Sequence, residues 1–194
     1  EMSMEVTSLG VQVHGGMGFV EETGAAQYMR DSRILPIYEG TNGIQALDFI
    51  GRKCLRDGGE GVSKLLTALD DTVESAEMED KIIAGLTANL HKSCAHCREA
   101  ISYVISNPSH ATSVAHPYLM IFGNTICYWL LCKLAFAAHE KIKDGDNDSF
   151  YSQKIATANF FASHILSRNE GLLESITRGF GSLNLAGESY FNQG

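Results

Sequence analysis

The chain has 194 residues, with a hydrophobic fraction of 44%, a charged fraction of 20% and a formal net charge of −8 at pH 7. This length can bury one good core, or one core with a smaller satellite. The negative charge and the scattered Lys and Arg residues argue against a nucleic-acid surface. Three prolines and the lack of alternating β-branched runs predict an all-α protein.

The first 58 residues are predicted to form one unit of short helices and glycine-rich loops. Eleven of the 19 glycines fall before residue 62, so this segment uses its backbone differently from the rest. A helix over 2–13 is broken by the glycines of the stretch Gln12-Val13-His14-Gly15-Gly16-Met17-Gly18-Phe19. A second helix runs over about 21–32, with an acidic first turn that the helix dipole favours.

A loop and a third helix complete this unit. Pro36 ends the helical pattern and predicts a loop over Ile34–Gly40. Thr41 or Asn42 then caps a third helix, which ends at the glycines after residue 57. We therefore divide the chain into 1–58 and 59–194.

Beyond residue 58, apolar residues recur at spacings of three and four, which predicts long helices. We expect them at about 62–73, 82–105, 117–143 and 150–178, with Pro117 in a first turn. Short polar turns between them indicate an up-and-down helical bundle. The last residues, 179–194, are predicted to be irregular.

The segment Tyr118–Ala138 has the length of a membrane span. Asn124, Thr125 and Lys133 lie inside it, and no basic flank sets an orientation. Because an interior lysine is costly in lipid, we expect a buried bundle helix and no membrane span.

Two motifs point to function. The glycine-rich stretch Gln12–Phe19 offers a loop where a large ligand can lie against the main chain. Tyr38-Glu39-Gly40-Thr41, 22 residues after it, offers a carboxylate on a closely approachable backbone. Singly, each is a weak signal, since Glu-Gly-Thr often starts a helix and Gly-Gly-x-Gly is common in loops.

Together with Arg30-Asp31 and the continuation Asn42-Gly43-Ile44-Gln45, these motifs resemble the C-terminal domain of acyl-CoA dehydrogenases over residues 1–56. The resemblance implies that Glu39 is the catalytic base, which takes the α-proton of an acyl-CoA thioester while a β-hydride passes to FAD. It implies that the backbone N–H of Glu39 helps to bind the thioester carbonyl. Tyr38 and Gly40 are then substrate-binding residues: Gly40 leaves space for the acyl chain and Tyr38 walls its channel.

The resemblance also implies FAD contacts in two places. The segment Gln12–Gly16 approaches the ADP half of FAD, often that of a neighbouring subunit. The turn Thr41-Asn42-Gly43 meets the cofactor near a helix N-terminus. Family members commonly have Gln where this chain has Gly43, which offers its backbone alone. The expected cofactor-binding residues are Gln12, Val13, His14, Gly15, Gly16, Thr41, Asn42 and Gly43.

As partners the resemblance implies an acyl-CoA substrate, electron-transfer flavoprotein or a similar acceptor, and a homo-oligomer, either dimer or tetramer. The chain begins inside what reads as a helix, so we expect a fragment that is inactive alone. Residues 59–194 look like the extra helical domain of bacterial members, with a structural role. An odd count of five cysteines favours a reducing, cytoplasmic location, and a mitochondrial one stays open.

Two other interpretations were weighed. The chain could be a helical interaction module that kept the fold without catalysis, although a scaffold has no need of a carboxylate at Glu39. His91, Cys94, His96 and Cys97 have the look of a metal cluster. The two cysteines fall on the apolar stripe of a helix, however, so we expect buried thiols and no metal.

Overall fold

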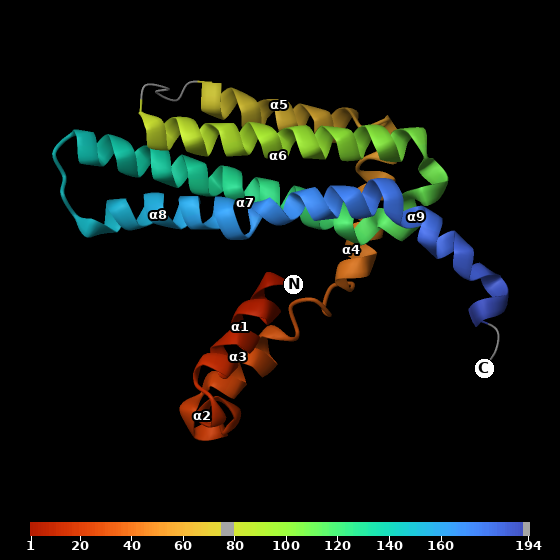
Figure 1. Ribbon diagram of the computed structural model, residues 1–194, viewed down its shortest axis with the longest axis horizontal. Helices are drawn as coiled ribbons and strands as arrows, with labels where there is room; N and C mark the ends of the chain where they lie inside the picture. Colours follow the sequence, from red (N-terminus) through yellow and green to blue (C-terminus); the bar gives the residue numbers. More distant parts are fainter. Residues whose placement is uncertain (75–79, 192–194) are drawn as a thin grey trace. The chain divides into compact units, whose positions relative to one another are not determined.

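The computed structural model describes residues 1–74 and 80–191, and the side chains of 1–72 and 80–181. Within these ranges the chain is helical and contains no strand, which confirms the predicted all-α fold (Figure 1). It divides into two compact units, Glu1–Gln45 and Ala46–Gly194. The elements are α1 Met2–Val13, α2 Gly16–Phe19, η1 Glu21–Thr23, α3 Ala25–Ser32, α4 Asn42–Arg52, η2 Leu55–Asp57, α5 Glu60–Glu74, α6 Lys81–Ser106, η3 Pro108–His110, α7 Ala111–Lys143, α8 Ser149–His164, η4 Leu166–Arg168 and α9 Asn169–Phe191, where η marks a 3-10 helix.

The first unit is built on the pairing of α1 with α3. Thr7 Oγ1 lies 2.8 Å from Ser32 Oγ, and the buried Ser32 hydroxyl also donates to the carbonyl of Met29 at 3.0 Å. The second predicted helix starts later than expected. Glu21–Thr23 forms a 3-10 turn, and Gly24 at φ 78° adopts the left-handed conformation, so the α-helix begins only at Ala25.

The second unit is an up-and-down bundle whose core is formed by residues of α4 to α9. Figure 1 shows α5 to α8 as neighbouring helices of alternating direction. Asp80 caps α6 by accepting from the backbone N–H groups of Ile82 and Ile83. Buried tyrosines tie the helices together: Tyr128 Oη donates to the Leu86 carbonyl at 3.1 Å, and Tyr118 Oη donates to Cys54 Sγ at 3.0 Å.

The expected start of the third long helix is wrong. The helix α7 begins at Ala111, and Pro117 lies inside it rather than in its first turn. A proline there removes one backbone hydrogen bond. Ala115 and Tyr118, both buried beside it, show that packing of this stretch outweighs that loss.

The expected single helix over 150–178 is also wrong, because a 3-10 turn divides it into α8 and α9. Asn169, with no exposed surface, begins α9 and joins the two helices to the core. Its Nδ2 donates to Ser93 Oγ at 2.8 Å and to Thr125 Oγ1 at 3.2 Å, and its Oδ1 accepts from Asn124 Nδ2 at 3.0 Å. The predicted irregular tail is helical as far as Phe191, and 192–194 lie outside the described residues.

The segment from Pro108 to Lys143, which includes α7, is long and apolar enough to cross a membrane, with a mean hydropathy of 1.5. Its polar residues Asn124, Thr125 and Tyr128 are buried and bonded to α6 and α9. This packing is that of a central bundle helix. Leu130 and Leu134 remain about half exposed.

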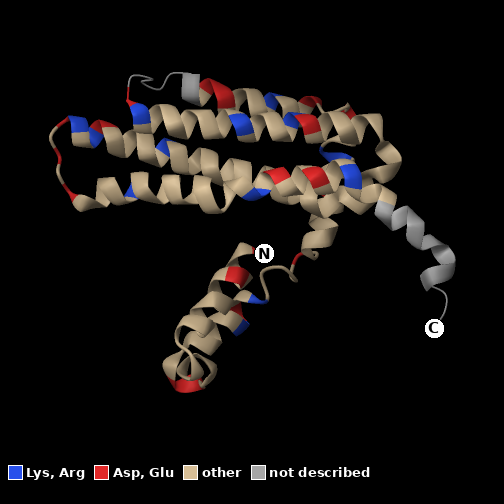
Figure 2. Cartoon of the chain, viewed as in Figure 1, with Lys and Arg blue, Asp and Glu red and all other residues tan. Residues whose placement is uncertain are grey.

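Charged side chains are interspersed along the helices of the second unit (Figure 2). Several form pairs of opposite charge, such as Lys64 with Glu60 and Arg178 with Glu174.

Candidate active site

Glu39 has an unusual backbone. At φ 54° it is the non-glycine residue with positive φ among those the structure describes, and Gly40 follows at φ 86°. A left-handed conformation costs a residue with a Cβ roughly 1–2 kcal/mol, so surrounding contacts must hold it. The Glu39 side chain is exposed in this chain, at the end of the predicted Ile34–Gly40 loop.

Two hydrogen bonds close the loop onto the start of α4. The Gln45 Nε2 donates to the Glu39 carbonyl at 2.8 Å, and the Asn42 N–H donates to the Pro36 carbonyl at 3.2 Å. A Cβ on Gly40 would lie 3.3 Å from both Gln45 Nε2 and Ile44 Cγ2, so glycine suits the position in space as well as in conformation. Among the described residues, none accepts a hydrogen bond from the Glu39 N–H. That donor is therefore free for a ligand.

The turn after Glu39 is the N-terminus of α4. Thr41 Oγ1 accepts from the Ile44 N–H at 3.4 Å, which makes Thr41 the cap, as one of the two predicted alternatives. Asn42 Nδ2 donates to Glu1 Oε1 at 2.9 Å, so the start of α1 lies against this turn. Gly43 has no bulky neighbour, with Thr41 Oγ1 3.7 Å from the position of a Cβ.

The glycine-rich loop lies at the other end of α1. Gly15 has φ 60°, and no atom lies within 4 Å of a Cβ built on Gly15 or Gly16. Gln12, Val13 and His14 are all exposed. This main chain is open to close approach by a large ligand, as the predicted contact with FAD requires.

His14 and Gly18 shape this loop from within. His14 Nδ1 bonds to the Gly10 carbonyl at 2.8 Å, so in this chain the imidazole satisfies the end of α1. A Cβ on the buried Gly18 would lie 2.2 Å from the carbonyl oxygen of Val11, a contact that no side chain permits. The third glycine of the motif is therefore a packing requirement between α1 and α2.

The two motifs do not meet at one point. Glu1 contacts Asn42 at the start of α1, whereas Gly15 follows its end, and a helix of 12 residues is about 18 Å long. Figure 1 shows α2 at the end of α1 away from the N-terminus. One copy of this unit thus holds the carboxylate and the glycine loop at opposite ends, which fits an extended ligand or contacts from two subunits.

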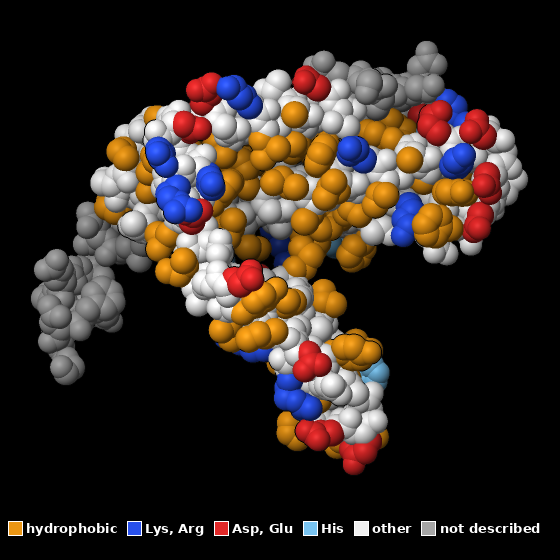
Figure 3. Space-filling view, turned by 180° about the vertical axis from the view of Figure 1, so that it is seen from behind, with side chains coloured by type: hydrophobic (Ala, Val, Ile, Leu, Met, Phe, Trp, Pro, Cys, Tyr) orange, Lys and Arg blue, Asp and Glu red, His pale blue; other side chains and the backbone are white. Residues whose placement is uncertain are grey.

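The first unit leaves much apolar surface open. This feature is not apparent from the motifs, because the same residues fall on helical stripes that usually become core. Large hydrophobic side chains are visible over this unit in Figure 3. The most exposed are Val13 at 84%, Phe19 at 82%, Tyr28 at 72% and Val6 at 61%.

The candidate metal ligands His91, Cys94, His96 and Cys97 lie in different environments and do not form one site. Burial raises the pKa of the Cys94 and Cys97 thiols to about 12, which makes them inert core residues. His91 pairs instead with Asp70 of α5 at 3.0 Å, and His96 lines a cavity described below. Within the described residues no set of three metal-ligating side chains comes together.

Comparison with protein families accounts for most of the chain. A model described as acyl-CoA dehydrogenase, C-terminal domain, matches residues 1–55, and one described as acetyl-CoA dehydrogenase C-terminal like matches residues 65–184. The gap between the matches contains the division predicted after residue 58. The division into compact units falls earlier, after Gln45.

Individual relatives agree. A 3-methylmercaptopropionyl-CoA dehydrogenase of Ruegeria pomeroyi is 40% identical over 170 residues, covering 86% of this chain and 29% of its own. The broad-specificity linear acyl-CoA dehydrogenase FadE5 of Mycobacterium tuberculosis is 32% identical, and the match covers 80% of this chain and 28% of that protein. A butyryl-CoA dehydrogenase of Syntrophomonas wolfei is 30% identical, and the match covers 91% of this chain and 30% of that protein.

The chain thus spans about three-tenths of the length of these curated relatives. The resemblance read from the motifs is confirmed by a family model over the first 55 residues and by a second over the helical bundle. The chain belongs to the acyl-CoA dehydrogenase family.

Proposed function

We propose that this chain is the C-terminal portion of a flavin-dependent acyl-CoA dehydrogenase and carries its base, Glu39. The observation that supports this most is the backbone of Glu39, held at φ 54° against its intrinsic preference. Strain of this kind is concentrated at functional sites, where it orients reacting groups. A helix start alone has no need of it.

In this proposal the backbone and side chain of Glu39 act together. The Glu39 N–H, free of partners among the described residues, donates to the thioester carbonyl and stabilises the enolate that forms. The carboxylate takes the α-proton, and the C–H electron pair becomes the new Cα–Cβ double bond as the β-hydrogen departs as hydride. FAD, when bound, supplies the hydride acceptor.

Neighbouring residues position the substrate. Gly40 keeps the space beside the reacting carbons clear, and the half-exposed Tyr38 walls the acyl channel. Gln45 holds the Glu39 carbonyl and so helps to fix the backbone of this residue. Such positioning contributes to the rate by removing the need to order the base and the substrate in each turnover.

The cofactor contacts follow the two ends of α1. Gly15 and Gly16 offer open backbone to the ADP half of FAD, with Gln12, Val13 and His14 beside it. At the other end, Thr41, Asn42 and Gly43 at the α4 N-terminus meet the cofactor near the site of chemistry. Because α1 separates these ends by about 18 Å, we propose that neighbouring subunits share the cofactor.

The proposed partners are an acyl-CoA, electron-transfer flavoprotein or a similar acceptor, and further copies in a homo-oligomer. The exposed apolar surface of the first unit supports burial against another protein surface. We propose that the 194 residues alone neither bind FAD tightly nor turn over.

The test is anaerobic titration of the full-length protein with a panel of acyl-CoAs, following the visible absorbance of the flavin. We expect bleaching by one chain-length class, and its near abolition by Glu39→Gln with FAD still bound. Glu22→Gln, an exposed carboxylate in the same unit, serves as the matched control and should bleach normally. A flavin that never bleaches, or a Glu39→Gln variant that bleaches like the parent, would instead indicate a non-catalytic helical scaffold.

A further inference from the structure

A polar cavity of about 120 Å³ lies in the second unit, where α6 meets η4, the end of α8 and the start of α9. This volume is well above the roughly 10–15 Å³ that one water molecule needs, and a tetrahedral oxyanion fits it. Six of the eight residues that line it are polar or charged. Its walls are formed by Asn89, Lys92, Ser93, His96, Ala162, Leu166, Ser167 and Glu170.

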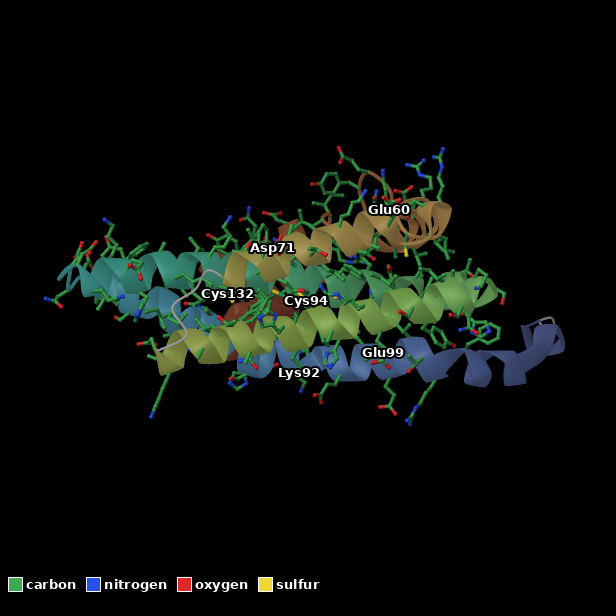
Figure 4. All side chains as sticks on the ribbon, turned by 90° about the horizontal axis from the view of Figure 1, so that it is seen from above. Glu60, Asp71, Lys92, Cys94, Glu99 and Cys132 are labelled. Carbon is green, nitrogen blue, oxygen red and sulfur yellow. The ribbon has the colours of Figure 1, made fainter. Side chains whose placement is uncertain are left out.

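Helix α6 presents its polar groups to the cavity on one face. Asn89, Lys92, Ser93 and His96 follow each other at spacings of three, one and three, so all four lie along the same side of the helix. Figure 4 shows Lys92 and Glu99 on the side of α6 that runs beside α9. The cavity is therefore a property of the α6–α9 seam.

The floor of the cavity is fixed by the buried network around Asn169. Ser93 is 2% exposed, and its Oγ accepts from Asn169 Nδ2 at 2.8 Å and lies 2.7 Å from Thr125 Oγ1. These two bonds use the Ser93 hydroxyl and hold the side chain in one position beside the cavity. The floor is thus preorganised.

His96 supplies an unused hydrogen-bonding group. Its Nδ1 is shielded from solvent and has no hydrogen-bond partner among the described residues. A buried polar atom without a partner destabilises the site it occupies. The His96 ring itself lines the cavity, so a ligand that turns the ring slightly gives this nitrogen a partner.

The rim carries one charge of each sign. Lys92 of α6 pairs with Glu170 of α9, and both side chains are more than half exposed. The Lys92 ammonium lowers the pKa of Glu170, so the carboxylate is ionised at neutral pH. An exposed pair of this kind stabilises the fold little, so a ligand can come between the two charges at little cost.

We propose that this cavity is a binding site for phosphate that bears a proton, with Lys92, His96 and Glu170 as its main ligands. Lys92 attracts the anion, the His96 ring and the Asn89 amide bond its inner oxygens, and the Glu170 carboxylate accepts from the P–OH group. The site belongs to the second unit and does not depend on the proposed dehydrogenase activity.

The Glu170 carboxylate distinguishes phosphate from sulfate. A fully ionised oxyanion such as sulfate has acceptors only, so its oxygens would face the Glu170 carboxylate with no proton between them. That contact is repulsive, whereas protonated phosphate turns it into a charge-assisted hydrogen bond. Selectivity for phosphate over sulfate is therefore the signature of this site.

The test is isothermal titration calorimetry of the intact protein with inorganic phosphate, and with sulfate at the same ionic strength. We expect saturable phosphate binding, with sulfate at least roughly tenfold weaker because a charge-assisted hydrogen bond is lost. Lys92→Met should weaken phosphate binding about tenfold or more, and His96→Gln severalfold. Lys64→Met, which breaks the exposed pair of Lys64 with Glu60 on α5, is the matched control and should bind phosphate like the parent.

Glu170→Gln is the decisive variant, because this exposed residue can be changed without disturbing the core. It should remove the preference, so that phosphate and sulfate bind alike. The proposal is wrong if phosphate gives no saturable heat up to about 10 mM, the weak limit of specific binding. It is equally wrong if Lys92→Met and Lys64→Met bind phosphate alike, or if Glu170→Gln keeps the preference over sulfate.

Discussion

The side-chain amide of Gln45 donates to the backbone carbonyl of Glu39 over 2.8 Å and so joins the first turn of α4 to a residue three positions before the helix. This bond and the Asn42–Pro36 bond are what the described structure offers to hold Glu39 at positive φ. The geometry of the proposed base is therefore set by a side chain that does not touch the substrate.

Gln45→Ala should lower the rate of flavin reduction by an acyl-CoA about tenfold, since one hydrogen bond that orients Glu39 is lost. FAD content should not change, because the Gln45 side chain bonds to the Glu39 carbonyl, whereas its bond to Thr41 is made by the backbone and remains in the variant. Stopped-flow reduction at saturating acyl-CoA measures the effect. Gln27→Ala, an exposed glutamine on α3, is the control, and equal rates for the two variants would show that Gln45 does not position the base.

Gly40→Ala should destabilise the first unit by about 1–2 kcal/mol, because an alanine must adopt φ 86° with its Cβ 3.3 Å from Ile44 and Gln45. Gly43→Ala has its nearest contact at 3.7 Å inside α4 and should be neutral or slightly stabilising. Thermal unfolding of the two variants beside the parent protein compares them. A Gly40→Ala variant as stable as Gly43→Ala would contradict the loop geometry.

Gly18→Ala should be among the most damaging single changes in the first unit. Its Cβ would meet the backbone oxygen of Val11 at 2.2 Å, and backbone cannot move aside as a side chain can. Gly16→Ala, where nothing lies within 4 Å, should fold normally. Circular dichroism and FAD content of the purified variants give the comparison, and two variants of equal stability would refute the close approach of α1 and α2.

Asn169→Leu should lower the free energy of unfolding by about 2–4 kcal/mol, because Asn124 and Ser93 lose a buried partner. Asn159→Ala is the control, since that exposed residue donates only to the Ile155 carbonyl one turn before it. Urea unfolding followed by circular dichroism measures both. An Asn169→Leu variant with parental stability would show that the network contributes little.

His96 should make stability depend on pH. Burial, followed by the nearby Lys92 ammonium, lowers its pKa in the folded state, while Glu170 and Glu99 act in the opposite direction. The unfolded chain therefore binds a proton more readily than the folded one, so stability should fall as pH drops below about 6.5. His96→Gln should remove this component, and urea midpoints at pH 5.5 and 7.5 test it. A parent and variant with the same pH dependence would contradict the lowered pKa.

Much of the architecture could be predicted from sequence, because helical periodicity and glycine positions are local signals. The long helices appear where apolar stripes recur, and the motifs of the first unit identify the family. The errors at Pro117 and Asn169 have one cause. A proline is tolerated inside α7 and a helix is divided before α9 because of tertiary packing, which a single sequence does not display.

The site itself was only partly predictable. The motif singles out Glu39, but nothing in the letters shows that a glutamate adopts φ 54° or that Gln45 holds it there. The phosphate cavity was not predicted, because Lys92 reads as an ordinary polar position on an amphipathic helix and His96 drew notice only as a candidate metal ligand. Its lining joins residues more than 70 positions apart in the chain.

Helix α1 fixes the distance between the glycine loop and the Glu39 turn, and this limits how far the length of α1 can vary. One inserted residue would shift the loop by about 1.5 Å and swing it around the axis by about 100°, away from any ligand that also reaches the other end. Seven residues would restore its direction but add about 10 Å. Insertions should therefore be tolerated in the turns of the second unit, such as 144–148, long before any is tolerated in Met2–Val13.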